Sequence, residues 1–587
     1  MNTYITNQRI ELVKAALGQI PFDLVIENVQ IVNVYSEEIK PGAIGIKNGR
    51  IATLHVPQIS STKHRIDGNN QFAIPGFCDT HVHIDSSLLT PAGMIELVMP
   101  CGTTTLFTDP MEIANVAGIR GLKAFLNGTK SLPCHIFMEV PSRVPTAPGL
   151  ETTGGVLDFN DVKKLLRLNS SVSLGELDPS KVLGFKEEYY GKINTALSMG
   201  KIANGHTAGL TSEELTAYAC AGLSDDHECV TFEEAMQCLQ SGLSVLIREG
   251  STERNLDRLI RGIIEHKTDT RHWMFCTDDK HPNDIVNEGH IDFMVNRAIE
   301  LGLLPIKAIQ MASLNASSHF RMDHEIGSLA PGRWADIILT DSLQKIKPNR
   351  VFFKGRLVAE KGNVIKALGK SSYPEWLYQT VHITRGMNPN DYRMTARDPR
   401  AKIHVIEIVP DQIVNKDIIS NLDVVDGNIL TNVKEDILKL AVVERYGKNG
   451  NIGITFVKGF GLTKGAISST VSHDHHNLII VGVDDTSMAT CARISQEIQG
   501  GFVAASGEKV ITTLPLPLGG LLSDRSPTDI IKDLEKMNEA AWSLGSKLPA
   551  PFMSLSFISL PTVPELGLTD RGLIDVRNHC IISPIVE

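Results

Sequence analysis

The sequence lacks the features that mark secreted and membrane proteins. Its nine cysteines are scattered and form no CxxC pair, so neither a disulfide framework nor a thiolate zinc site is expected. No stretch approaches the roughly 20 consecutive apolar residues of a membrane span, and the N-terminal region has no uninterrupted apolar segment typical of a signal peptide. These absences predict a cytoplasmic protein with reduced thiols.

Positive charge is not concentrated anywhere along the chain either. The formal net charge is -10, and Lys and Arg form no cluster. Because nucleic-acid and membrane-surface binding need a basic patch, we expect neither of these partners. The expected partner is a small molecule. The sequence does not specify an oligomeric state, so assembly into a homo-oligomer stays open.

The length of 587 residues, with 42% hydrophobic residues, is too great for one core and indicates about three or four domains. Two stretches of short alternating strands flank a long interior segment, which predicts a small β domain assembled from both. The expected division is an N-terminal helix and the first part of the β domain in 1–74, the interior in 75–320, the second part of the β domain in 321–370, and a separate α+β domain in 371–587.

The interior segment has the length and pattern of a (β/α)8 barrel. Eight short apolar runs occur in it, from "FAIPGFCDTHVHI" to "HWMFCTDD", and most are followed by a stretch with helical spacing such as "TFEEAMQCLQSG". Alternating strands and helices indicate a parallel sheet, and eight repeats favour closure into a barrel. The predicted fold class is therefore α/β, with a TIM-like barrel between a composite β domain and a C-terminal α+β domain.

Metal-capable residues follow the predicted strands at their carboxyl ends, where barrel active sites form. The motif "HVH" places two imidazoles on one side of the first strand, because alternate residues of a strand share a face. The whole set is His81 and His83 on the first strand, Glu176 on the fourth, His206 on the fifth, His227 on the sixth and Asp278 on the eighth.

Four imidazoles and two carboxylates without a thiolate suit divalent Zn, Fe or Mn. Six protein ligands exceed what one open tetrahedral site uses, which favours two ions over one. Glu176 could bridge the ions, and a hydroxide held between them is a nucleophile at neutral pH. Asp278 would take its proton and pass it to a leaving group. This set predicts a hydrolase with Asp278 and Glu176 as catalytic residues.

These motifs carry a family resemblance. "IPGFCDTHVHIDSS", "GTTTLFTDP", "NGHTAGL", "AGLSDDHEC" and "CTDDKHPNDIVNEGHID" resemble the amidohydrolase superfamily and, within it, the microbial adenine deaminases. "SHDHHNLIIVG" and "LSFISLPTVPELGLTDRGLIDV" are similar to the C-terminal domain of that family. The resemblance covers nearly the whole chain. It implies hydrolysis of adenine to hypoxanthine and ammonia at a binuclear metal site with the same six ligands.

Two positions differ from the family pattern and leave an alternative open. Met111 stands in "DPMEIANV" where the family has histidine, and a thioether does not readily bind a hard ion. The segment "GELDPSKVL" around Glu176 is also unusual. The alternative is another amidohydrolase reaction, either deamination of a different amino-heterocycle or hydrolysis of an amide.

Two further groups have two interpretations each. The first group closes the seventh strand and consists of Arg248, Glu249 and Ser251. These residues could bind the purine ring nitrogens, or Arg248 and Glu249 could simply pair with each other.

The second group consists of His473, His475 and His476. These histidines could bind a further metal or cap the substrate, or they could form the solvated end of a polar hairpin. We keep the second group out of the predicted primary site.

Overall fold

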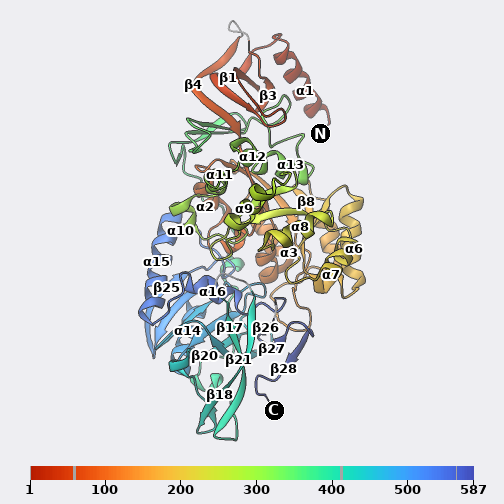
Figure 1. The fold of residues 1–587 in the computed structure, drawn as a ribbon. Coiled ribbons are helices and arrows are strands. Elements are labelled where there is room, and N and C mark those ends of the chain that lie inside the picture. Colours follow the sequence, from red (N-terminus) through yellow and green to blue (C-terminus); the bar gives the residue numbers. More distant parts are fainter. Residues whose placement is uncertain (1, 57–60, 410–413, 564, 587) are drawn as a thin grey trace.

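The computed structural model describes residues 2–56, 61–409, 414–563 and 565–586 and shows an elongated molecule (Figure 1). A β domain with helix α1 (Asn2–Ala16) lies at one end, parallel strands and helices form the middle, and a second β-rich part lies at the other end. Among the residues described, no helix combines the length and apolar character needed to cross a membrane.

The sheet at the N-terminal end is assembled from two distant parts of the sequence. Its order is β16-β15-β14-β13-β4-β1-β2-β3. The first part supplies β1 (Phe22–Asn33), β2 (Glu38–Lys47), β3 (Arg50–Thr53) and β4 (Thr62–Pro75), and the second supplies β13 (Ile337–Thr340), β14 (Arg350–Phe353), β15 (Arg356–Glu360) and β16 (Asn363–Val364). β4 and β13 join the two parts in antiparallel register, with Ile74 opposite Ile338.

Two parallel sheets form the middle of the molecule. One has the order β5-β6-β7-β8-β9 and the other β10-β11-β12. Their strands are β5 (Phe77–Val82), β6 (Thr103–Thr108), β7 (His135–Val140), β8 (Ser171–Leu177), β9 (Ile202–Gly205), β10 (Asp225–Asp226), β11 (Ser244–Arg248) and β12 (Trp273–Cys276). Backbone hydrogen bonds link the sheets at both sides, from Ser224 N to Ala203 O (2.8 Å) and from Asp278 N to His81 O (2.9 Å).

Helices follow these strands, as the sequence pattern predicts. They are η1 (Ile84–Ser86), α2 (Pro91–Val98), α3 (Met111–Gly128), α4 (Phe159–Leu166), α5 (Pro179–Val182), α6 (Glu187–Ser198), α7 (Ser212–Ala219), α8 (Phe232–Gln240), α9 (Leu256–His266), α10 (Pro282–Glu288), α11 (Ile291–Glu300), α12 (Pro305–Met311) and α13 (Leu314–His319). Thr231 and Glu234 form a capping box at the start of α8, which satisfies backbone N–H groups of the first turn.

The C-terminal part contains a sheet of order β19-β18-β17-β21-β20-β23-β22-β24-β25 and a smaller sheet β26-β27-β28. Its strands are β17 (Arg400–Ile408), β18 (Asn415–Val425), β19 (Asn428–Ile429), β20 (Ile437–Val443), β21 (Ile452–Lys458), β22 (Ala466–Ser469), β23 (Leu478–Gly482), β24 (Gly501–Ser506), β25 (Lys509–Pro515), β26 (Leu566–Thr569), β27 (Gly572–Asp575) and β28 (Cys580–Ile582). The helices are η2 (Glu375–Tyr378), η3 (Pro389–Tyr392), η4 (Val433–Glu435), α14 (Asp485–Glu497), α15 (Pro527–Ser543) and α16 (Pro551–Phe557).

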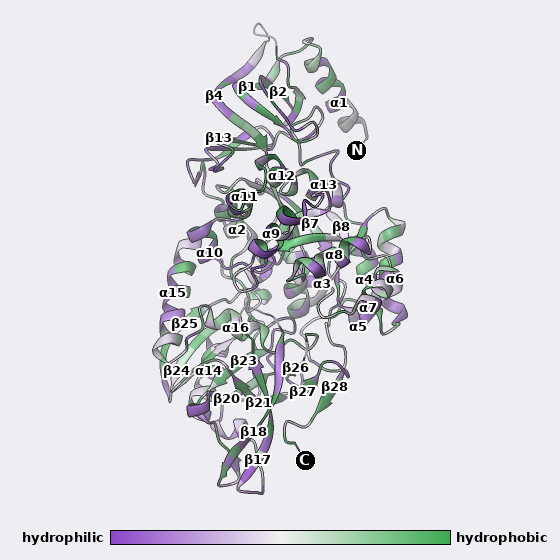
Figure 2. Ribbon diagram, in the orientation of Figure 1, coloured by the Kyte–Doolittle hydropathy of each residue, from purple (hydrophilic) through white to green (hydrophobic). Residues whose placement is uncertain are grey.

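In the C-terminal part, buried and exposed strands differ in the hydropathy of their residues (Figure 2). β20 is buried along its whole length, whereas β18 is mostly exposed and appears as mixed colours in the hairpin with β17, at the end of the molecule far from β1. The loop between β22 and β23 contacts the strand-end region, where Asp474 pairs with Arg143 in the loop after β7. The C-terminal part therefore lies against the strand ends where the sequence predicts the active site.

Candidate metal centre and active site

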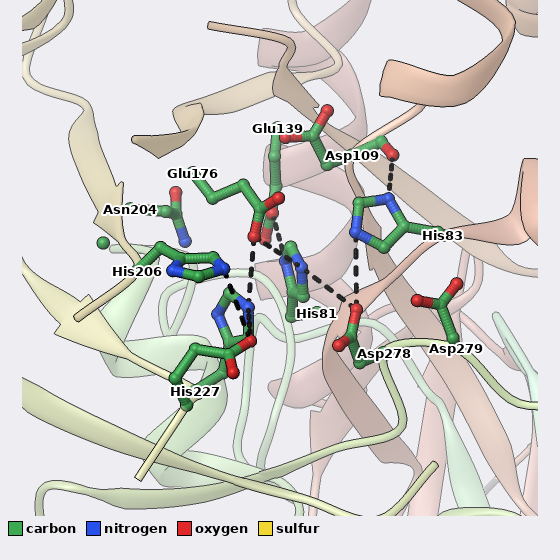
Figure 3. A network of polar contacts seen from close by, with 12 residues as sticks. His81, His83, Asp109, Glu139, Glu176, Asn204, His206, His227, Asp278 and Asp279 are labelled. Carbon is green, nitrogen blue, oxygen red and sulfur yellow. Dashed lines mark hydrogen bonds and ion pairs between the residues drawn. The ribbon is translucent and has the colours of Figure 1, made fainter. Parts of the chain in front are cut away.

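The structure brings all six predicted metal ligands together in one buried place (Figure 3). Each is at most 7% exposed. His81 lies in β5 and His83 directly after it, Glu176 lies in β8, His206 follows β9, His227 follows β10, and Asp278 follows β12. Their common position at the carboxyl ends of parallel strands is the reason that side chains so distant in the sequence converge.

The ligand atoms form two overlapping groups that share His81. In the first, Asp278 Oδ1 lies 3.3 Å from His83 Nε2 and 3.6 Å from His81 Nε2. In the second, Glu176 Oε2 lies 3.7 Å from His81 Nε2 and 3.1 Å from His227 Nε2. Each group offers three donor atoms within 4.8 Å of one another. A third group, His206, His227 and Glu228, shares His227 with the second.

Backbone geometry holds Asp278 in this position. Its φ of 55° is left-handed, a conformation that costs free energy for a residue other than glycine. Hydrogen bonds on either side fix it, because Asp278 N donates to His81 O and His83 N donates to Asp278 O at 3.2 Å. Such local strain is common at functional sites, where the surrounding structure maintains it.

Two histidines of the cluster are oriented by contacts behind them. Glu139 Oε2 lies 2.7 Å from His81 Nδ1, and the carbonyl oxygen of Asp109 lies 2.8 Å from His83 Nδ1 (Figure 3). Both contacts turn Nε2 toward the cluster, as in metal sites where the other ring nitrogen donates to an oxygen. His81 Nε2 is buried and has no hydrogen-bond partner among the described residues. A buried ring nitrogen without a hydrogen-bond partner fits the role of a metal ligand.

Two buried arginines keep the carboxylates ionised. Arg143 pairs with Glu176, and Arg248 Nη2 lies 2.6 Å from Asp278 Oδ2. Burial raises the pKa of each carboxyl group, but the arginines together with the neighbouring histidines outweigh it. They hold the pKa of Glu176 well below, and that of Asp278 below, the usual range. Ionised carboxylates are the forms that bind metal.

Several residues of this site were not predicted from the sequence. Glu139 is the penultimate residue of β7 and could have been found by the strand-end rule used for the other strands. Glu228 follows His227 directly and lies 3.3 Å from its Nε2. Arg143 lies in a loop after β7 and carries no motif, so nothing in the sequence indicates its pairing with Glu176.

The predicted substrate-binding residues separate in the structure. Arg248 lines the cavity at the cluster. Glu249 points elsewhere, because its Oε2 accepts a hydrogen bond from Leu256 N (3.2 Å) and its Oε1 lies 3.7 Å from Arg254. Ser251 donates to Asp284 and lines a neighbouring pocket. The alternative in which Arg248 pairs with Glu249 does not hold either, since the ion-pair partners of Arg248 in the described chain are Glu228, Glu253, Asp278 and Asp279.

The histidine cluster of the C-terminal part is not a solvated hairpin end. His473, His475 and His476 are each at most 3% exposed. His473 lines the cavity together with His83, Asp278 and Phe557. Met111, the first residue of α3, belongs by contrast to a buried hydrophobic cluster and does not line this cavity. The departure from the family pattern at Met111 therefore changes core packing rather than the cavity wall.

The cavity itself is small, about 30 Å³. It is lined by strand-end residues on one side and by residues of the C-terminal part on the other, which are His473, Asp474, Phe557, Leu560, Thr562 and Val563. Volume of this size is sufficient for a water molecule. The site therefore combines charged, ligand-type side chains with a small space between the strand ends and the C-terminal part.

Comparison with known proteins gives full-length matches. The Amidohydrolase family model matches residues 72–358, and the Adenine deaminase C-terminal domain model matches residues 412–580. The adenine deaminase of Desulforamulus reducens is 53% identical over 577 residues, covering 98% of each chain. The adenine deaminase of Methanothrix thermoacetophila is 40% identical over 581 residues, covering 99% of this chain and 100% of the relative. That of Moorella thermoacetica is 38% identical over 581 residues, covering 98% of each chain.

Proposed function

The chain belongs to the adenine deaminase family of the amidohydrolases, and from this membership we propose that it hydrolyses adenine to hypoxanthine and ammonia. The match supports this reaction because it extends over both the parallel-strand region and the C-terminal part. In the reaction a water oxygen bonds to the purine carbon that bears the amino group. The bond from that carbon to the amino nitrogen breaks, and ammonia leaves.

One observation carries the mechanistic proposal: the convergence of six buried ligand-type side chains from the ends of five strands. We propose that His81, His83, Glu176, His206, His227 and Asp278 hold two divalent ions, with Mn, Fe and Zn as candidates. When bound, such ions lower the pKa of water and supply a nucleophile at neutral pH. The orphaned Nε2 of His81 and the two groups that share this residue support this assignment.

Asp278 is the proposed proton carrier. Arg248 engages its Oδ2, which leaves Oδ1 directed at the histidine cluster. The ionised carboxylate accepts a proton from the attacking water and delivers it to the departing amino group, so that neutral ammonia is released. Arg143 and Arg248 act as positioning residues in this scheme, because each fixes a carboxylate and keeps it ionised.

We further propose that the two parallel sheets close into one (β/α)8 barrel over residues 75–320. The hydrogen bonds from Asp278 to His81 and from Ser224 to Ala203 support closure at both seams. The small β domain and the C-terminal domain then flank opposite ends of this barrel (Figure 1). In this arrangement the C-terminal domain covers the end that carries the active site, as the lining of the cavity suggests.

The test is ammonia release from adenine, guanine, cytosine and a cyclic amide by protein loaded separately with Zn, Fe and Mn, with metal content measured on the same samples. The proposal predicts release from adenine with about two metal equivalents per chain. Release only from another substrate would establish the alternative amidohydrolase reaction. No release from any substrate by metal-loaded protein would refute the proposed function.

A further inference from the structure

In the C-terminal part, the loop that connects β22 to β23 lines the cavity. His473, on this loop, lines the same cavity as His83 and Asp278 although it lies far from them in the sequence. Its neighbour Asp474 places Oδ2 3.0 Å from Arg143 Nη1, so the loop contacts two charged groups of the strand-end region. Both loop residues are buried. The cavity wall is therefore incomplete without this loop.

The imidazole of His473 is held on several sides. Its Nδ1 lies 2.9 Å from Glu112 Oε1, and its backbone N donates to Ser556 O at 2.9 Å. The ring stacks on Phe557 with a centroid distance of 4.7 Å and an interplanar angle of 9°. A ring fixed in this way loses little further conformational freedom when it binds a ligand.

Glu112 is itself fixed by a second histidine. The other oxygen of Glu112 accepts a hydrogen bond from His476 Nε2. His476 Nδ1 accepts from Ser472 N at 3.1 Å, so the proton of the neutral His476 ring is on Nε2, facing Glu112. This chain of contacts runs from the loop backbone through Glu112 to His473. Its effect is to leave only one edge of the His473 ring without a partner.

That edge carries Nε2, which is buried and has no hydrogen-bond partner among the described residues. The closest carboxylate oxygen, Asp279 Oδ1, lies 3.9 Å away, beyond hydrogen-bond distance. Burial lowers the pKa of His473, but Asp279 and Glu112 outweigh it and raise the pKa to about 10. With a proton on each nitrogen, Nδ1 donates to Glu112 and Nε2 presents an unused donor to the cavity.

We propose that His473 is a specificity-determining residue whose Nε2–H donates a hydrogen bond to a ring nitrogen of the bound purine. This inference rests on the proposed function and extends it to the C-terminal domain. Three of the four ring nitrogens of adenine are acceptors, whereas most charged groups around the cavity are carboxylates, which cannot donate when ionised. The terminal nitrogens of Arg143 and Arg248 are already paired with carboxylates. His473 Nε2 offers the cavity a donor that has no carboxylate within hydrogen-bond distance.

A competing interpretation is that Glu112, His473 and His476 hold a third cation, since their ligand atoms lie within 4.8 Å of one another. Two contacts favour the hydrogen-bonded arrangement. Each oxygen of Glu112 already engages a different imidazole, and His476 presents N–H rather than a lone pair to it. The free Nε2 of His473 belongs to the opposite edge of the ring from the nitrogen that contacts Glu112.

The test uses substitutions that separate the two ring nitrogens. In His473→Asn the amide replaces Nδ1 and keeps a donor for Glu112, but nothing replaces Nε2–H. We expect the Kd of adenine to rise roughly 10- to 100-fold, the range for a hydrogen bond to a charged group. It is measured by calorimetry on metal-loaded protein in which every variant also carries Asp278→Asn, so that adenine is not turned over during the titration. His473→Gln, whose amide reaches the Nε2 position, should restore part of the affinity. His475→Asn changes a buried histidine of the same loop that does not line the cavity, and should leave Kd unchanged.

Analogues of adenine in which one ring nitrogen is replaced by carbon identify the acceptor. One of the 1-, 3- and 7-deaza compounds should bind the wild type weakly and lose no further affinity in His473→Asn, because its contact is already missing. Equal Kd values for wild type and His473→Asn would overturn the inference. So would a third metal equivalent present in wild type and absent in the variant. Failure of the wild type to deaminate adenine would instead refute the proposed function, and this inference with it.

Discussion

Glu139 offers a sharp test of the metal centre because it touches a proposed ligand but no substrate. Its side chain is fully buried, and Oε2 lies 2.7 Å from His81 Nδ1. Glu139→Gln keeps the volume and an oxygen acceptor while removing the negative charge. The charge strengthens His81 as a ligand, and loss of such a partner typically costs 10- to 100-fold in metal affinity. The expected weakening is about 1.4–2.7 kcal/mol of binding free energy.

The assay is competition for Mn between the protein and a chelator of known affinity, with the bound metal measured after separation. Metal-free Glu139→Gln should be no less stable than wild type, because burial raises the pKa of Glu139 and disfavours its charge, although His81 opposes this shift. The effect should therefore appear in metal affinity and not in the melting temperature of the metal-free protein.

A matched control lies at the other end of the same strand. His135, the first residue of β7, places Nε2 2.8 Å from Asp336 Oδ2, and both residues are buried. Asp336→Asn removes the charge from a similar pair that is remote from the metal cluster, and it should leave metal affinity unchanged. Equal metal affinity of Glu139→Gln and wild type would refute the reasoning. An equal loss in Asp336→Asn would attribute the effect to general destabilisation.

Three further predictions follow from the same geometry. Asp278→Asn should lower kcat by roughly 10²- to 10⁴-fold in an ammonia-release assay, since it removes the proton carrier, and an unchanged kcat would contradict that role. Glu249→Gln should stabilise the fold in urea titrations by about 2 kcal/mol at pH 8 and not at pH 4. Burial raises the pKa of Glu249 to about 6, so the folded wild type loses stability as pH rises from 4.5 to 6. Equal gains at both pH values would contradict this. Chelation should lower the melting temperature, because ions at a free concentration of 100 times their Kd add about 2.7 kcal/mol to the free energy of unfolding. Superimposable melting curves with and without chelator would argue against a bound ion.

Strand order and periodicity account for what could be predicted from the sequence. The six ligand-type residues could be found because each follows an apolar run, and parallel strands place such positions at one edge. Glu249 shows the limit of this rule. It follows Arg248 directly, and successive side chains of an extended strand point to opposite sides, so a motif that groups the two cannot share one cavity.

Contacts between distant segments could not be predicted in this way. Glu112 meets His473 and Arg143 meets Asp474 only because the C-terminal part packs against the strand ends. Periodicity reports which face of an element is buried but not which element covers it. The histidine motif could therefore be recognised as unusual, whereas its burial depended on packing that a single sequence does not encode in any local pattern.

The joining of β4 to β13 has a consequence for how the protein is made. β4 is synthesised early, but its antiparallel neighbour emerges from the ribosome only after the entire intervening segment, on the order of tens of seconds later at typical translation rates. During that time one edge of β4 has unpaired backbone groups, which is a site for aggregation. The nascent chain therefore faces its greatest risk of misassembly before residues 337–340 arrive, and chaperone dependence should be highest in that window.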